Sequence, residues 1–160
     1  SIANMGWILA WHFRAVGLSL AAMLVILVSL VTIYRRLQEA PSGSIWETVS
    51  VDLPFRVYLG WIMTASIVNL AALFSATGAF PFGLEMDQWA IISVAAALTL
   101  FTWTATAYRD AVIPLVLCWA AVGIYARPDG ISEPVRLLAL ASAAAMAVMS
   151  AMAMWSWRAR

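Results

Sequence analysis

Residues 15–34 read AVGLSLAAMLVILVSLVTIY, a run of twenty residues without a charged side chain. At about 1.5 Å per residue, a helix of this length covers roughly the 30 Å hydrocarbon thickness of a bilayer. Backbone in lipid must satisfy its own hydrogen bonds, and the run lacks the alternating pattern of a barrel strand. It therefore predicts a membrane-spanning helix, which ends at Arg35 and Arg36.

Four further apolar runs predict spanning helices at 57–80, 88–108, 111–126 and 137–157. The polar stretch between the first two spans, 35–56, is expected to be the one substantial loop. Residues 1–13 are apolar but too short to cross a bilayer as a helix. The sequence therefore predicts an all-α, polytopic transmembrane bundle of about five spanning helices plus a short N-terminal apolar helix. Residues 1–80 and 81–160 are expected to form two parts of a single membrane domain.

The composition excludes most soluble proteins. Hydrophobic residues make up 64% of the chain and charged residues only 11%, against roughly 25% charged residues in a soluble domain. The net charge of +1 gives no field that would attract nucleic acid. Membrane lipids are the expected surroundings, and no nucleic-acid partner is expected.

The sequence shows no catalytic or metal-binding constellation. His12 is the only histidine, which excludes a site with several histidines. All eight acidic residues fall at the ends of the apolar runs or between them, which argues against an ion-coupled pump. We expect no enzyme activity and no metal site.

The distribution of arginine predicts the orientation. Six arginines would lie on one side and three on the other: Arg35, Arg36, Arg56, Arg109, Arg158 and Arg160 against Arg14, Arg127 and Arg136. This places the 35–56 loop and the C-terminus in the cytoplasm. The chain opens with Ser1 inside an apolar stretch, so an incomplete or processed N-terminus is expected.

One apolar run carries a candidate ligand-binding stripe. Trp61, Ala65 and Asn69 are four residues apart and share one face of a helix, with Tyr58 about one turn earlier. An aromatic ring, a small residue and an amide suit a flat apolar ligand with a polar edge. The alternative is that Asn69 makes a hydrogen bond between helices, worth about 1 kcal/mol.

Two other features also have two readings. His12, which follows Trp11, has the chemistry to ligate the metal of a haem or chlorophyll, or it lies at the membrane interface. Ala139, Ala143, Ala147 and Ala151 recur every four residues. They either form a face for close helix packing or reflect an alanine-rich composition.

The segment PFRVYLGWIMTASIVNLAALF (residues 54–74) resembles the last helix of the TspO/MBR family, which typically reads PYLxWxxxAxxLN. Tyr58, Leu59, Trp61, Ala65 and Asn69 match that pattern. The opening ANMGWILAWHF is similar to the family's LNxxWxxxFF helix at Asn4 and Trp7, with Trp11 and His12 in place of aromatic residues. The likeness is closest to the longer bacterial tryptophan-rich sensory proteins, of which this chain would be the C-terminal portion.

The resemblance implies a pocket for a porphyrin or related flat hydrophobic molecule. Its lining would come from Asn4, Trp7, Tyr58, Trp61, Ala65 and Asn69, with Trp11 and His12 nearby. It also implies a role as sensor, regulator or carrier, in a homodimer or a larger membrane complex. The family's usual orientation would put the 35–56 loop outside the cytoplasm, opposite to the arginine count.

Two function classes remain open from the sequence. In the first, the protein binds a tetrapyrrole-like ligand between helices and does no chemistry. In the second, it is a structural accessory subunit of a respiratory or photosynthetic membrane complex, packed against partner helices, lipids or pigments.

Overall fold

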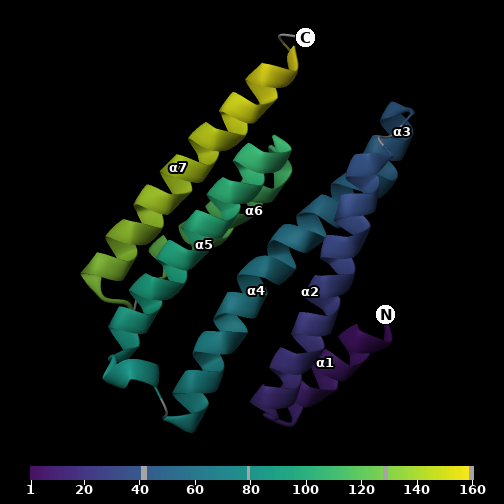
Figure 1. The fold of residues 1–160 in the computed structure, drawn as a ribbon. Helices are drawn as coiled ribbons and strands as arrows, with labels where there is room; N and C mark the ends of the chain where they lie inside the picture. The colour runs from purple at the N-terminus through teal and green to yellow at the C-terminus, as the bar shows by residue number, and fades with distance from the viewer. Residues whose placement is uncertain (41–42, 79, 128–129, 159–160) are drawn as a thin grey trace. The chain divides into compact units, whose positions relative to one another are not determined.

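The computed structural model describes residues 1–40, 43–78, 80–127 and 130–158, and the regular structure in them is helical (Figure 1). This confirms the predicted all-α membrane fold. The chain divides into two compact units, Ser1–Ala79 and Phe80–Arg160.

The first unit is built on α2 (Val16–Glu39), which packs against both α1 (Ile2–His12) and α4 (Leu53–Thr77). A tight turn, in which Arg14 adopts a left-handed φ of 56°, folds α1 back along α2. Helices α2 and α4 run antiparallel (Figure 1). The buried apolar side chains come from these two helices and include Met23, Ile26, Leu30, Leu59, Ile62 and Met63.

The connection between α2 and α4 is shorter than the loop expected at 35–56. Helix α2 continues to Glu39, and helix resumes as α3 (Ile45–Glu47), followed by a π-helical turn (Thr48–Asp52) that leads into α4. The Ser44 hydroxyl accepts a hydrogen bond from the Glu47 backbone N–H at 3.2 Å, and Asp52 pairs with Arg56 at 3.9 Å. Capping and paired charges stabilise helix in a polar sequence, so the lack of an apolar run did not mean a loop.

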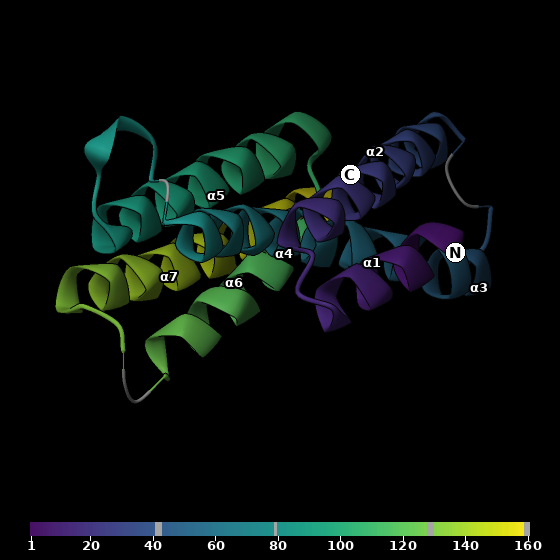
Figure 2. The same cartoon turned by 90° about the horizontal axis from the view of Figure 1, so that it is seen from below.

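The second unit contains α5 (Met86–Tyr108), α6 (Val112–Tyr125) and α7 (Glu133–Arg158), preceded by a 3₁₀ turn at Pro81–Gly83. Helix α7 packs against both α5 and α6 and lies between them in the projection of Figure 2. The core is formed by residues that include Ala97, Phe101, Ile113, Leu117, Ala139, Ala143 and Met146.

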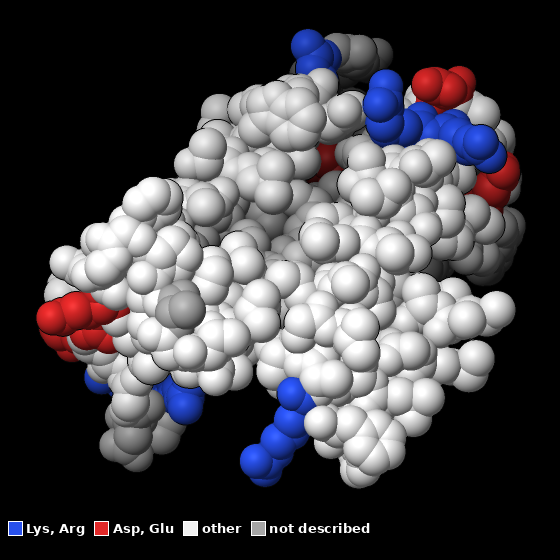
Figure 3. Space-filling view, turned by 60° about the horizontal axis from the view of Figure 1, so that its bottom comes forward, with Lys and Arg blue, Asp and Glu red and all other residues white. Residues whose placement is uncertain are grey.

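Among the residues that the structure describes, four helical segments are long and apolar enough to cross a membrane: Val16–Glu39, Ile45–Thr77, Met86–Tyr108 and Glu133–Trp155. Five were expected. The remaining one, α6, has 14 residues and is about 21 Å long at 1.5 Å per residue. At most 33% of the apolar stretch in each long segment is buried, so their outer faces need an apolar solvent. On the face shown in Figure 3, acidic and basic side chains gather in small patches, and most of the surface carries no charge.

Candidate functional site

A hydrogen bond joins α1 to α4 in the first unit. The Tyr58 hydroxyl donates to the Asn4 side-chain oxygen at 2.7 Å, although the residues are 54 positions apart. Asn4 lies in the first turn of α1 and Tyr58 in the second turn of α4. The structure therefore brings together two candidate residues from separate segments of the sequence.

Trp7 presents a buried donor on the same face of α1. It follows Asn4 by three residues, and its indole nitrogen, Nε1, is buried with no hydrogen-bond partner among the described residues. Leaving a buried donor unsatisfied costs about 1–3 kcal/mol. The Trp7 and Trp11 rings stack, with centroids 6.4 Å apart and planes at 28°. This face of α1 thus combines a stacked aromatic pair with a buried donor that has no partner among the described residues.

Asn69 joins α4 to α2. The Ser19 hydroxyl donates to the Asn69 side-chain oxygen at 2.8 Å, and the Asn69 side-chain nitrogen donates to the Ala65 carbonyl at 3.0 Å. Ser19 and Asn69 are both buried. The structure therefore shows the hydrogen bond between helices that the sequence left as an alternative. Together with the bond to Ala65, it leaves both the oxygen and the nitrogen of the Asn69 amide with a partner.

Trp61 and His12 lie toward the outside of the unit. The Trp61 side chain is 45% exposed. His12 is exposed at the end of α1, where its ring meets Phe13 edge to face at 5.2 Å. Within the described residues there is no group of three or more His, Cys, Asp or Glu that would hold a metal ion. Ligand contacts by Trp61, Ala65 and Asn69, and pigment ligation by His12, stay predictions.

Ser19 and Asp110 could not be singled out from the sequence alone. Ser19 stands in an apolar run, and only the packing of α2 on α4 shows that it faces Asn69. Asp110 is fully buried between α5 and α6, where a carboxylate oxygen accepts hydrogen bonds from the Val112 and Ile113 backbone N–H groups at 2.8 and 3.1 Å. Its position at the end of an apolar run was visible, but its burial was not.

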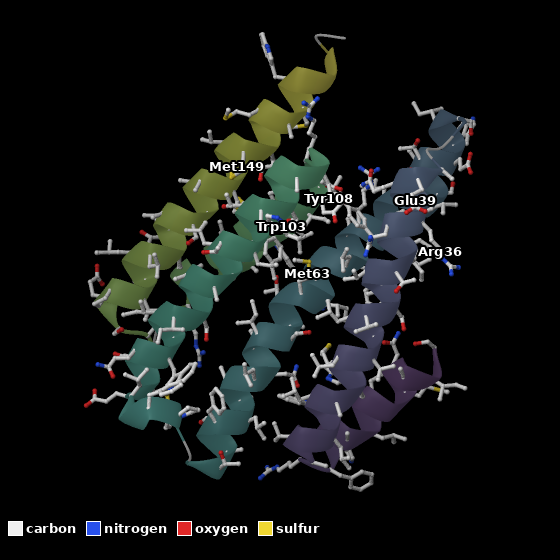
Figure 4. All side chains as sticks on the ribbon, viewed as in Figure 1. Arg36, Glu39, Met63, Trp103, Tyr108 and Met149 are labelled. Atoms are coloured by element: carbon white, nitrogen blue, oxygen red, sulfur yellow. The ribbon has the colours of Figure 1, made fainter. Side chains whose placement is uncertain are left out.

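The aromatic and charged side chains of the other helices mark their ends or outer faces (Figure 4). Arg36 and Glu39 are exposed in the last turns of α2. On α5, Trp103 is 55% exposed and packs edge to face on Tyr108 at 5.8 Å. Such tryptophans are typical of a surface in contact with lipid and its interface.

The sequence model of the family described as TSPO-like protein matches residues 1–155. This match extends through both units, beyond residues 1–80, where the resemblance was strongest. No curated protein and no solved structure matches the chain. The chain therefore belongs to the TSPO-like protein family and is an integral membrane protein of the TspO type.

Proposed function

We propose that the protein binds a flat apolar molecule that carries hydrogen-bond acceptors, such as a tetrapyrrole, on the surface formed by α1 and α4. It then acts as a sensor or carrier in a bacterial inner membrane and performs no chemistry on the ligand. The observation that carries this proposal is the buried Trp7 Nε1 donor, which has no partner in the described protein and follows the Asn4–Tyr58 hydrogen bond by one helical turn.

The side chains at this surface have the chemistry for such a ligand. Stacked indoles offer a large, flat apolar surface, and aromatic rings favour offset or edge contacts with other π-systems. A tetrapyrrole supplies a planar ring and carboxylate acceptors. An acceptor that reached Trp7 Nε1 would remove the cost of the unsatisfied donor, while Asn4 and Tyr58 provide further polar groups at the same place.

The other candidate residues support the site from a distance in this proposal. Asn69 holds α4 against α2 through Ser19 and so positions the part of α4 that carries Tyr58. Trp61, Ala65 and His12 are proposed to extend the contact surface toward lipid, from which an apolar ligand would enter.

The test is a titration of the purified full chain in detergent with protoporphyrin, followed by the absorbance of the porphyrin and by tryptophan fluorescence. We expect saturable binding. Trp7→Phe keeps an aromatic ring but removes the donor, so affinity should fall about tenfold, which corresponds to about 1.4 kcal/mol. Tyr58→Phe should weaken binding because it releases Asn4.

The matched control is Trp119→Phe. Trp119 is 65% exposed on α6 in the second unit, so this variant loses one tryptophan without altering the site. Equal affinities of the Trp7→Phe and Trp119→Phe proteins would contradict the proposed site. Absence of saturable binding, together with stoichiometric purification in a large respiratory or photosynthetic complex, would favour the accessory-subunit alternative.

A further inference from the structure

The turn that precedes α5 exposes an aromatic side chain almost completely. Phe82 is the second residue of the 3₁₀ turn Pro81–Gly83, and its side chain is 90% exposed. No other large hydrophobic residue in the described ranges is as exposed. Burial of a phenylalanine side chain stabilises a protein, so exposure of this ring to water would forgo that stabilisation.

The backbone at Phe82 is also strained. Its φ of 64° and ψ of 13° lie in the left-handed region, which L-residues with a side chain rarely adopt. Such a conformation is unfavourable for a residue other than glycine. Gly83 follows with a φ of 67°, where no such cost applies. The turn therefore holds a bulky aromatic residue at a position where glycine would adopt the backbone conformation with less strain.

The turn is fixed by hydrogen bonds at its base. The Trp89 indole N–H donates to the Pro81 carbonyl at 3.3 Å, and Glu85 and Gln88 form a reciprocal capping box at the start of α5. Trp89 stands in the first turns of the apolar helix α5, where tryptophan marks the boundary between hydrocarbon and headgroups. The tip of the turn is thus held next to the start of α5.

We propose that Phe82 is a membrane anchor whose phenyl ring enters the interfacial layer of the bilayer next to the start of α5. The occupant is lipid, because the spanning helix α5 begins four residues after Phe82 and its apolar side chains Met86 and Ile92 are themselves 59% and 41% exposed. Glu85 and Asp87, at the start of α5, are exposed and acidic. They disfavour a membrane surface rich in negatively charged lipids, so the anchor suits zwitterionic headgroups.

The experiment places a nitroxide on Phe82→Cys in the full chain, with Cys118→Ala to remove the native thiol. The protein is reconstituted in phosphatidylcholine vesicles, and collision rates are measured with oxygen, which enters lipid, and with a water-soluble nickel chelate. Two controls carry the same label. Val28→Cys, at a position on α2 where the valine side chain is 66% exposed, reports hydrocarbon. Asp87→Cys, in the first turn of α5, reports a polar position.

We expect the ratio of oxygen to nickel collisions at residue 82 to exceed that at residue 87 severalfold and to lie below that at residue 28, which is at the centre of α2. A ratio equal to that at residue 87 would place the ring in water and overturn the anchor. Low collision rates with both reagents would show that a second copy or another protein covers the ring, which would also overturn it. An inserted label at residue 87 would show that the probe itself drives insertion and would remove the support for the anchor.

Discussion

At the scale of single residues, the polar side chains in the apolar helices of the first unit are held by specific partners. Ser19 and Asn69 are buried and bonded to each other across α2 and α4. In membranes such bonds contribute about 0.6–1.7 kcal/mol, since the separated helices also find other partners. A pair of this kind fixes the register of two helices whose other contacting side chains are mostly apolar.

We expect Asn69→Ala to lower the free energy of unfolding in detergent by about 1–2 kcal/mol, because it leaves the buried Ser19 hydroxyl without its acceptor. Ser19→Ala should cost less, since the Asn69 side-chain nitrogen keeps its bond to Ala65. A double-mutant cycle should give a coupling energy of about 1 kcal/mol. Ser29→Ala, which removes only a bond within α2, is the control. Additive effects of the two substitutions would rule out the coupling.

The sequence did not identify the partners of the polar residues in this region. The spacing of Trp61, Ala65 and Asn69 predicts one stripe on α4, but Asn69 is buried against α2 whereas Trp61 is 45% exposed, and the spacing carries no information about what α2 presents to α4. The Asn4–Tyr58 contact depends on the turn at Arg14, whose left-handed backbone sets the direction of α1. Contacts made across helices depend on such directions, which periodicity within one helix does not contain.

At the scale of helices, hydropathy located the spanning segments but misjudged where helix stops. The charged stretch after Arg36 read as loop, whereas Ser44 capping and the Asp52–Arg56 pair stabilise helix there. On α7 the expected stripe holds for Ala139 and Ala143 and fails at Ala147, which is exposed. A spacing of four residues drifts around a helix of 3.6 residues per turn, so the buried face passes instead through Met146, Ser150 and Ala153.

Arg136, on α7, caps the C-terminal end of α6. Its guanidinium donates to the Tyr125 and Arg127 carbonyls at 3.3 and 3.2 Å and lies 5.8 Å from the centre of the Tyr125 ring. The last carbonyls of a helix have no partner within it, so this side chain supplies what the end of α6 lacks.

We expect Arg136→Lys to destabilise the protein by about 1–2 kcal/mol, because lysine keeps the charge but cannot reproduce the fork of donors. Hydrogen exchange in the last turn of α6 should become faster while exchange in α2 stays unchanged. Arg35→Lys, at the exposed end of α2, should change stability by less than about 0.5 kcal/mol. Unchanged exchange in α6 would show that the arginine does not hold this end.

At the scale of the whole molecule, the order of helices determines which ends share a side of the membrane. If each of α2, α4, α5, α6 and α7 crosses once, residues 40–44 and the C-terminal end lie on one side and residues 126–132 on the other. The short α6 decides this arrangement, since its failure to cross would move the end of α7 to the opposite side.

We expect Glu39→Cys, in a Cys118→Ala protein, to react with a membrane-impermeant maleimide only after the cells are permeabilised, because the arginine count places it in the cytoplasm. Glu133→Cys, at the start of α7, should react in intact cells. The reverse pattern would favour the family's usual orientation over the arginine count. Reaction of both residues from the same side would show that α4, α5 and α6 do not all cross the membrane, since three crossings would put the two residues on opposite sides.

The length of α6 has a consequence for the surrounding lipid. Leu115, Trp119 and Val122 point outward from this helix, yet it reaches only about two thirds of the way across a 30 Å hydrocarbon layer. Acyl chains beside it must shorten or tilt, at a cost of fractions of a kcal/mol for each ångström of mismatch. If α6 crosses, we therefore expect the bilayer to be thinner beside it and short-chain lipids to gather there.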